Sequence, residues 1–399
     1  GLAEASKKFR NIEDLDQEGI LSENGNEIAW GTIGNASTSE GPFFEAINAA
    51  GVLKVPMVIS IWDDEYGISV HSKYQTTKES ISEVLKGFQR EGKGDGYEIF
   101  VVNGWNYTQL VDVYTKAAAI AREEHVPVII HVKELTQPQG HSTSGSHERY
   151  KDAERLAWEK EYDCIAKMRE WILSFELEDL DGKILKFVEN EDELVALEKE
   201  TKVEVRNAKN KSWNEYLKPM LKERKELLNL LEKAAGKSEN EIFIEKLKRE
   251  LESIDEPIRK NILSVGRRSL IYLRNEEFKE KELLQNWIKE YMLIQQPKYS
   301  AHLYSELDNR ATNIAEVEAI YDEEAEDVDA RLVLRNNFDT LLGQNKKILI
   351  FGEDSGKIGD VNQGLEGLQE KHGEERVYDT GIREVTIIGQ GVGMAMRGL

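Results

Sequence analysis

Residues 34–69, GNASTSEGPFFEAINAAGVLKVPMVISIWDDEYGIS, decide the fold class of this chain. A polar turn of small residues stands between a strand pattern and a helix pattern, and the next strand pattern closes on Asp63 and Asp64. In an α/β unit both turns lie at the carboxyl ends of neighbouring parallel strands, where ligands bind. An amide oxygen of Asn35 and a carboxylate that converge beside free backbone N–H groups suit a magnesium ion holding a diphosphate. An ordinary strand–turn–helix unit with a capping serine and a surface Asp pair has the same pattern, so this stretch alone leaves the function open.

The sequence around this stretch alternates between strand and helix patterns. Helix patterns separate the strand patterns, and Ser39 is expected to cap the first helix. Strand patterns cover 27–34, 56–62, 97–102 and 126–132, and helix patterns cover 39–53, 81–89 and 107–124. Four strands joined by helical crossovers predict an α/β domain built on a doubly wound parallel sheet.

After residue 150 the chain becomes rich in charge. Residues 190–260 predict a helical hairpin broken at 236–238, with Pro219 starting or kinking its helix. Residues 318–330 are strongly acidic and predict a linker or an exposed face.

The last seventy residues read as the opening of a second α/β sheet. The expected order is a helix at 330–342, a strand at 346–352, a helix at 361–372, a strand at 376–381 and a helix from 383. The chain ends inside this apolar helix pattern without a stop signal, which indicates a segment of a longer polypeptide.

Composition excludes several classes of protein. The 399 residues carry a net charge of −22, from 75 acidic and 53 basic residues, which argues against nucleic-acid and acidic-membrane partners. The single cysteine, Cys164, cannot form an intrachain disulfide and predicts a reducing, cytoplasmic setting. No apolar run approaches the roughly 20 residues that span a bilayer.

Two further places carry chemistry. His141 lies in the polar loop 139–146, where it could donate to a phosphate or move a proton, although loop histidines are often only solvated. Glu384 precedes an apolar run, VTIIGQGVGMAM, and is expected to become partly buried with a raised pKa; a first-turn Glu favoured by the helix dipole is the alternative. Glu353, at the end of the strand pattern ILIF, is similarly ambiguous.

Together and in this order, these segments resemble the thiamine-diphosphate-dependent first component of the 2-oxoacid dehydrogenase complexes, in a version with fused α and β subunits. Residues 1–225 resemble the later part of the α subunit. Residues 330–399 resemble the opening of the β subunit, through FGEDSGKIGDVNQGL (351–365) and YDTGIREVTIIGQGVGMAMRGL (378–399).

The resemblance implies the thiamine-diphosphate-binding fold, with a helical middle region and the start of a second α/β domain. It divides the chain into four segments. They are an α-like diphosphate and magnesium domain at 1–150, α-like C-terminal helices at 151–235, a helical linker region at 236–329, and the start of a β-like pyrimidine-binding domain at 330–399.

The resemblance also implies a magnesium site. The family has Gly-Asp-Gly followed about 30 residues later by Asn-Asn, whereas this chain has Gly34-Asn35-Ala36 and Asp63-Asp64, so the acid and the amide have exchanged places. The total charge is unchanged. The implied ligands are Asn35, Asp64 and the backbone carbonyl of Tyr66.

Diphosphate contacts are implied for Ala36 and Ser37. Trp62 and Gln137 stand at two positions where the family commonly has arginine, so some diphosphate charge must be neutralised elsewhere.

By the same resemblance, His141 contacts the diphosphate side of the site and supports acyl transfer, and Glu353 contacts the cofactor. Glu384 bonds the aminopyrimidine ring of the cofactor and activates it as a nucleophile. Ser142 and Ser144 align with a loop that is phosphorylated in animal relatives, and nothing in the chain gives a reason to expect a kinase here.

The implied function is oxidative decarboxylation of a 2-oxoacid, with branched-chain substrates favoured over pyruvate. The implied partners are a lipoyl-bearing dihydrolipoyl acyltransferase and further copies of the chain, as a dimer of fused chains or an α2β2-like assembly. A transketolase-type enzyme and a cofactor-free scaffold are the alternatives. The segments HSTS (141–144) and GEDSGKIGDVNQG (352–364) argue against the transketolase. We expect these 399 residues to hold most of the metal site without a complete active site.

Overall fold

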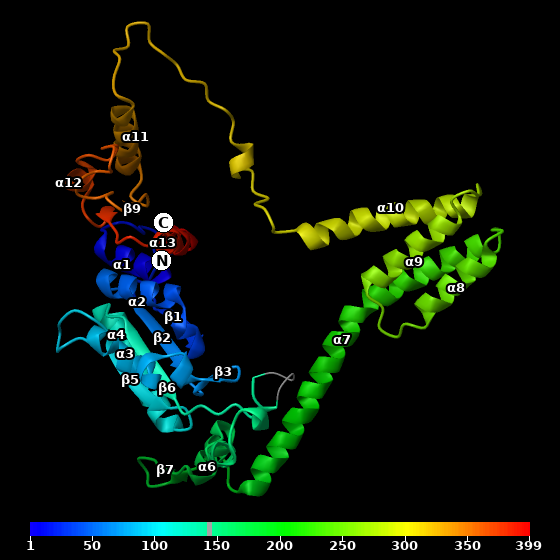
Figure 1. Ribbon diagram of the computed structural model, residues 1–399, viewed down its shortest axis with the longest axis horizontal. Coiled ribbons are helices and arrows are strands. Elements are labelled where there is room, and N and C mark those ends of the chain that lie inside the picture. The colour runs from blue at the N-terminus through cyan, green and yellow to red at the C-terminus, as the bar shows by residue number, and fades with distance from the viewer. Residues whose placement is uncertain (142–145) are drawn as a thin grey trace. The chain divides into compact units, whose positions relative to one another are not determined.

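The computed structural model describes residues 1–141 and 146–399 (Figure 1). They form two compact units. Gly1–Glu189 together with Glu324–Leu399 make the first, called here the α/β unit, and Asn190–Glu323 make the second, called the helical unit.

The α/β unit is built on a parallel sheet of four strands in the order β1-β2-β6-β5. The strands are β1 (Ala29–Gly34), β2 (Met57–Trp62), β5 (Glu98–Asn103) and β6 (Val128–Lys133). Gly34 pairs with Trp62, and Trp62 with Val132, so β1, β2 and β6 reach the same edge of the sheet. The turns that follow these strands therefore emerge close together.

Helices cover both faces of this sheet. On one face, α2 (Gly41–Leu53) and α3 (Ile81–Val84) pack over a core that includes Ile61 and Tyr97. On the other face, α4 (Tyr107–Glu124) packs over Val58 and Ile130. The prediction of a doubly wound parallel α/β fold is confirmed.

Ser39 does not cap α2, contrary to the expectation from sequence. Residues Ala36–Ser39 form a short 3-10 helix, η1, and α2 begins at Gly41 with Pro42 in its first turn. A proline fits there because its missing N–H would have no partner in a first turn and its fixed φ is already helical. The Ser39 hydroxyl donates instead to the carbonyl of Gln75, 3.1 Å away.

The remaining α-helices and strands of residues 1–189 are short. They are α1 (Leu2–Asn11), β3 (Tyr66–Gly67), β4 (Val70–His71), α5 (Ala153–Glu161), α6 (Cys164–Ser174), β7 (Leu177–Glu178) and β8 (Ile184–Leu185). The β3–β4 and β7–β8 pairs are antiparallel hairpins.

Residues 330–399 add a second, smaller parallel sheet of two strands, β9 and β10. The elements are α11 (Ala330–Gln344), β9 (Ile350–Gly352), α12 (Leu368–His372), β10 (Val377–Asp379) and α13 (Glu384–Met396). The helix expected at 361–372 is shorter than predicted, because Gln363 and Gly367 adopt left-handed backbone conformations and α12 starts only after them.

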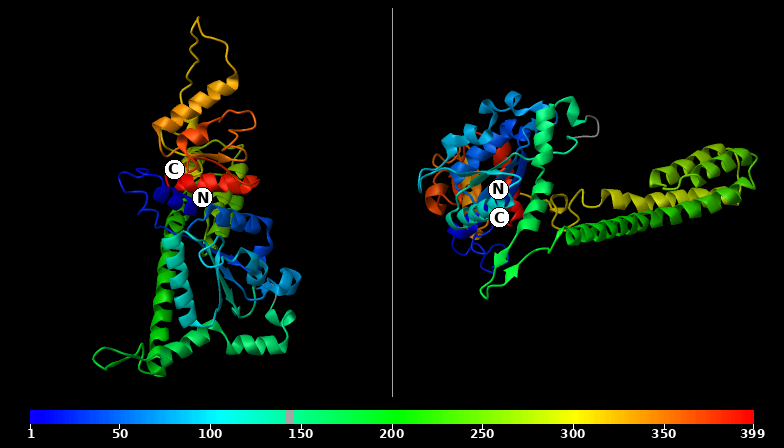
Figure 2. Two further views of the ribbon diagram at one scale, coloured as in Figure 1. Left: turned by 90° about the vertical axis from the view of Figure 1, so that its left-hand side faces the viewer. Right: turned by 90° about the horizontal axis from the view of Figure 1, so that it is seen from below.

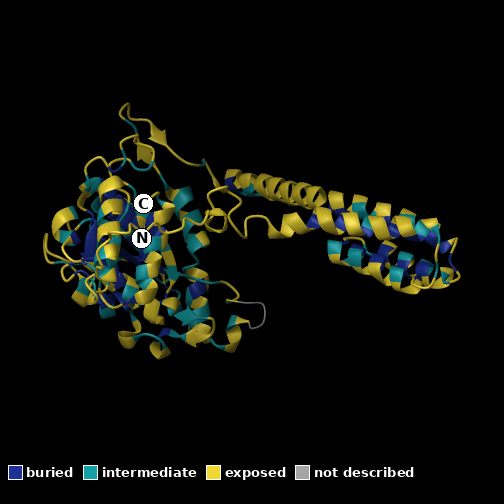
Figure 3. Ribbon diagram, turned by 90° about the horizontal axis from the view of Figure 1, so that it is seen from above, coloured by how far each residue is buried: buried dark blue, intermediate teal, exposed yellow. Residues whose placement is uncertain are grey.

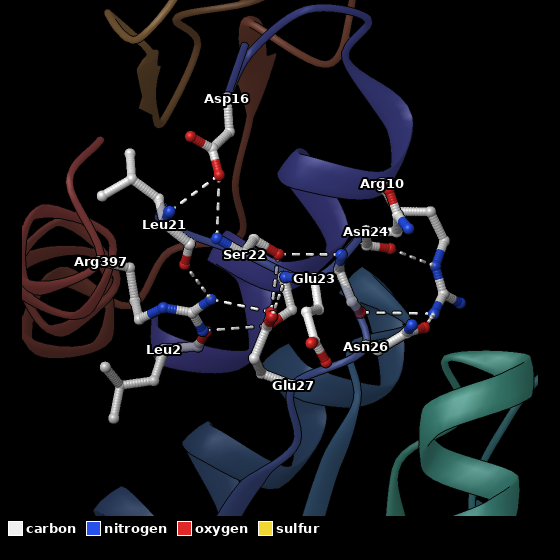
Figure 4. A network of polar contacts seen from close by, with 12 residues as sticks. Leu2, Arg10, Asp16, Leu21, Ser22, Glu23, Asn24, Asn26, Glu27 and Arg397 are labelled. Atoms are coloured by element: carbon white, nitrogen blue, oxygen red, sulfur yellow. Dashed lines mark hydrogen bonds and ion pairs between the residues drawn. The ribbon is translucent and has the colours of Figure 1, made fainter. Parts of the chain in front are cut away.

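Polar contacts attach α13 to the N-terminal part of the same unit. Buried Glu4 of α1 accepts hydrogen bonds from the Tyr378 hydroxyl (2.6 Å) and the Gln390 amide (2.9 Å). At the other end of α13, Arg397 donates to Glu27, 2.9 Å away (Figure 4). Segments some 370 residues apart in sequence thus share one packed interface.

The helical unit contains α7 (Glu191–Ala235), α8 (Glu241–Glu252), α9 (Arg259–Tyr272) and α10 (Lys279–Ser300). Within it, α10 lies alongside α7 (Figure 2). The buried faces turn inward and the outer faces are exposed (Figure 3). Its core is formed by large aliphatic side chains, among them Leu227, Leu231, Ile244, Leu251, Ile262 and Leu284.

The break after α7 at 236–238 is where the sequence predicts it, but Pro219 does not start a helix. The helix α7 runs through this residue. Pro219 cannot donate to the carbonyl of Glu215, and both residues are exposed, so water can replace the missing hydrogen bond.

Residues 301–329 contain only one short 3-10 turn, and their side chains are exposed, as the acidic sequence of 318–330 predicts. Among the described residues, every helix is too short or too polar to cross a lipid bilayer.

Candidate functional site

A cavity of about 740 Å³ lies at the edge of the sheet where β1, β2 and β6 end. Its lining combines the turn after β1, the turn after β2 and the loop after β6. It brings together six of the residues singled out from sequence: Asn35, Ala36, Ser37, Asp64, Tyr66 and His141.

The turn after β1 contributes Asn35 at the start of η1. Asn35 is buried; its backbone N–H donates to the Trp62 carbonyl (2.9 Å), and its own carbonyl accepts from the N–H and the hydroxyl of Thr38 (3.1 and 2.6 Å). Ala36 and Ser37 follow in the first turn of η1, where backbone N–H groups have no partner inside the helix. This arrangement suits an anionic ligand in the cavity.

The turn after β2 contributes Asp64. Its Oδ1 accepts a hydrogen bond from the Tyr66 N–H, 3.1 Å away. Burial raises the pKa of the Asp64 carboxyl above its ordinary value, opposed by that hydrogen bond and by nearby Lys151. A carboxylate that burial disfavours gains free energy when a cation binds beside it.

The backbone of this turn is strained. Glu65 adopts a left-handed conformation (φ 68°), which costs a residue with a side chain about 1–2 kcal/mol. Two contacts of charged groups offset that cost: Asp63 Oδ1 accepts from the Glu65 N–H (2.8 Å), and the Glu65 carboxylate pairs with Arg155 (2.5 Å). Arg155 also donates to the Asp64 carbonyl (3.2 Å), so the turn is held from both sides.

Gly67 lies close to the turn after β1. A Cβ added there would lie 2.5 Å from the Ala36 Cβ and 2.7 Å from the Gln75 side-chain amide. Only glycine lets the β3 backbone pass so close to η1, and this keeps the cavity open between them.

The donor set fits a hard divalent cation. Asp64 offers a carboxylate oxygen, Asn35 an amide oxygen and Tyr66 a backbone carbonyl oxygen, and Mg²⁺ prefers oxygen ligands. Among the described residues no three His, Cys, Asp or Glu side chains converge on a metal position, so a cation here would depend on neutral oxygens.

The described lining contains no lysine or arginine. Trp62 and Gln137, at the positions where the resemblance implies arginine, both line the cavity, and the Trp62 indole donates instead to Ser60 (2.9 Å). His141 is the one histidine among the described lining residues. Ser142 and Ser144 lie outside the described residues.

Glu353 and Glu384 are not in this cavity. Glu384 begins α13 and Glu353 follows β9, and both are exposed. The expectation that the apolar run would bury Glu384 is wrong for this chain, because α13 packs through the opposite face, with Gln390, Gly393 and Met394 buried.

The sequence patterns do not single out His131, a buried residue behind the turn after β2, as a residue of this site. It sits in an aliphatic strand, where only the contrast between one imidazole and its neighbours could have indicated a special position.

The comparisons with known proteins match both ends of the chain. The family model described as dehydrogenase E1 component matches residues 1–218, and the model described as transketolase, pyrimidine binding domain, matches residues 326–399.

Similar proteins include subunits of two dehydrogenases. The chain is 28% identical over 148 residues to a pyruvate dehydrogenase E1 component subunit alpha of Rickettsia bellii, covering 37% of this chain and 43% of that protein. It is 31% identical over 142 residues to a mitochondrial 2-oxoisovalerate dehydrogenase subunit alpha of Dictyostelium discoideum, covering 35% and 30%. Its C-terminal part is 48% identical over 61 residues to a pyruvate dehydrogenase E1 component subunit beta of Acholeplasma laidlawii, covering 15% and 19%. The chain thus spans less than half the length of each of these curated relatives.

Proposed function

Because the chain belongs to the dehydrogenase E1 component family, we propose that it takes part in the oxidative decarboxylation of a 2-oxoacid with thiamine diphosphate and Mg²⁺. The observation that carries the proposal is the single cavity shared by Asn35, Asp64, Tyr66 and His141. The crevice at the carboxyl edge of a parallel sheet is where this class of fold binds ligands.

The residues of the cavity have separate roles in this proposal. Asn35, Asp64 and the Tyr66 carbonyl would hold Mg²⁺, and the N–H groups of Ala36 and Ser37 would bind the diphosphate. His141 would donate to the diphosphate side and support acyl transfer.

The C-terminal part would serve the other end of the cofactor. Glu384 would exchange a proton with the aminopyrimidine ring, and Glu353 would contact the cofactor nearby. Thiamine diphosphate, when bound, supplies the nucleophilic carbon that attacks the keto group and takes up the electrons left by carbon dioxide.

Branched-chain 2-oxoacids are the favoured substrates and pyruvate the second choice, with the acyl group passing to lipoamide on a dihydrolipoyl acyltransferase. Relatives named for pyruvate and relatives named for 2-oxoisovalerate both occur among the similar proteins. The proposal includes the division of the chain into four segments: 1–150, 151–235, 236–329 and 330–399.

We also propose that further copies of the chain cover α13. Its outer face carries apolar side chains at helical spacing, and each is more than half exposed in this chain: Val385, Ile388, Val392 and Met396. A contiguous apolar helix face of this kind marks a protein–protein contact.

Calorimetric titration of the full chain with thiamine diphosphate, with and without Mg²⁺, tests the proposal. We expect thiamine diphosphate to bind only when Mg²⁺ is present. The same heat of binding without Mg²⁺ would contradict the proposed metal site. A second assay then separates a dehydrogenase from a transketolase. A dehydrogenase should reduce an artificial electron acceptor only when a 2-oxoacid is present. The ratio of kcat/KM for branched-chain substrates and pyruvate tests the substrate preference.

A further inference from the structure

A fully buried histidine lies directly behind the turn that carries Asp64. His131 is on β6, where its neighbours Ile129, Ile130 and Val132 are buried aliphatic residues. Its imidazole is 0% exposed. A polar ring in such a place loses its hydration, so it persists only if hydrogen bonds replace the lost water.

Both ring nitrogens of His131 have partners. Nε2 lies 2.8 Å from Asp63 Oδ2, and Nδ1 lies 2.8 Å from the Ser82 hydroxyl. An ionised Asp63 can only accept, so Nε2–H donates to it, and in the neutral ring Nδ1 then accepts from Ser82. The imidazole thus links α3, β6 and the turn after β2 by directional contacts.

Asp63 carries this link into the turn. Its backbone N–H donates to Val132 (2.9 Å) and its carbonyl accepts from Leu135 (3.1 Å). Its side chain uses one oxygen for His131 and the other for the N–H of Glu65, the residue with the left-handed backbone. The position and orientation of the turn therefore depend on a side chain that His131 holds.

The two residues of this turn that face the cavity come just after Asp63 in the sequence. Asp64 and Tyr66 line it, whereas Asp63 and His131 are buried outside its lining. His131 touches neither proposed ligand and can act on them only through the turn. In metal sites, groups that orient the ligands commonly change metal affinity 10- to 100-fold when they are replaced.

We propose that His131 is a positioning residue that, through Asp63, holds the turn 63–66 so that the Asp64 carboxylate and the Tyr66 carbonyl face a divalent cation. The inference rests on the proposed function, because it assumes that the cavity binds such a cation.

Binding of Mn²⁺ to the full chain tests it. Mn²⁺ takes the same oxygen ligands as Mg²⁺, and electron paramagnetic resonance measures the free ion at saturating thiamine diphosphate without requiring turnover. For His131→Leu we expect the Mn²⁺ dissociation constant to rise about tenfold or more. His131→Gln, which keeps an N–H donor for Asp63, should recover most of that loss.

A matched control distinguishes positioning from general destabilisation. His125 is a second buried histidine of the same unit, with Nε2 2.8 Å from the Gly25 carbonyl. It has a left-handed backbone that asparagine tolerates. His125→Asn should lower the melting temperature while the Mn²⁺ dissociation constant stays at the wild-type value.

Asp63→Ala removes the same link from the turn side, so the test stands even if His131→Leu does not fold. It should weaken Mn²⁺ binding about as much, and the double variant should be little worse than either single variant, because both break one chain of contacts. If either His131→Leu or Asp63→Ala binds Mn²⁺ with wild-type affinity, the positioning role of His131 is wrong while the proposed function still stands. Absence of Mn²⁺ binding by the unmodified chain would overturn the proposed function together with it.

Discussion

Asp64 and Asn35 reach one cavity from turns that follow neighbouring strands. In the proposed magnesium site, Asp64 would supply the negative charge and Asn35 a neutral oxygen. The exchange of acid and amide relative to the family pattern leaves this pair of oxygens in place, since both turns open at the same sheet edge.

A first prediction separates charge from geometry at Asp64. Asp64→Asn keeps an oxygen of the same shape but removes the negative charge, so Mg²⁺-dependent binding of thiamine diphosphate should weaken about tenfold, and Asp64→Ala should abolish it. Calorimetric titration at several Mg²⁺ concentrations measures both variants. Wild-type affinity in Asp64→Ala would remove this residue from the metal site.

A second prediction concerns Gly67. Gly67→Ala places a methyl group 2.5 Å from the Ala36 Cβ, so either η1 or the Gln75 side chain must move. We expect cofactor affinity to fall about tenfold with a melting temperature lowered by only a few degrees. Gly87→Ala is the matched control, because a Cβ there meets no atom within 4 Å.

The C-terminal end of α13 shows how a few contacts hold a helix in place. At its C-terminal end Arg397 donates to Glu27 (2.9 Å), and Ser22 and the N–H of Glu23 donate to the same carboxylate (2.8 and 2.5 Å; Figure 4). Burial opposes ionisation of Glu27, but these donors outweigh it and lower its pKa to about 2.

A third prediction follows from this pKa. The folded chain holds Glu27 ionised below its ordinary pKa of 4.5, so the contribution to stability is complete above about pH 4.5 and disappears as the pH falls towards 2. Since the side chain is one-third exposed, we expect about 1–2 kcal/mol after solvent screening. Urea unfolding at pH 7, 4, 3 and 2 should show Glu27→Gln less stable than wild type at pH 7, with the difference shrinking below pH 4.5 and nearly lost at pH 2. Glu23→Gln, which leaves the N–H bond to Glu27 intact, should not show this convergence.

A fourth prediction tests the apolar face of α13. Ile388 is 70% exposed, so Ile388→Glu should cost the isolated fold less than about 0.5 kcal/mol but should weaken self-association of the full chain. Sedimentation velocity over a range of concentrations measures the change. Val361→Glu, at a similarly exposed position outside α13, is the control; equal dissociation in both variants would refute the proposed contact.

Considered as a whole, the molecule has two compact units with separate cores. Among the described residues, those of the helical unit's core lie between 217 and 291, and those that line the cavity lie between 34 and 141. Stability of the one and ligand binding by the other are therefore expected to be independent.

A fifth prediction measures this independence. Leu231 is fully buried in the helical unit, so Leu231→Ala should destabilise that unit by about 2–5 kcal/mol. Circular dichroism at 222 nm should then show an earlier loss of helix, while Mg²⁺-dependent binding of thiamine diphosphate stays at its wild-type value. Leu197→Ala, on an exposed part of the same helix, should change neither; a parallel loss of cofactor binding in Leu231→Ala would mean that the units are coupled.

Local patterns in the sequence were enough to predict the parallel sheet, its crossover helices, the helical hairpin and the cluster at Asn35 and Asp64. Apolar periodicity and turn residues act within a few positions of one another, and the carboxyl ends of parallel strands always meet at one edge. Three other features depend on the tertiary structure, which no local pattern reports. His131 meets Asp63 only because β6 lies beside β2, and α13 exposes Glu384 only because its opposite face packs on α1. Pro219 is tolerated within α7 because that side of the helix faces water, which the helical periodicity around it does not reveal.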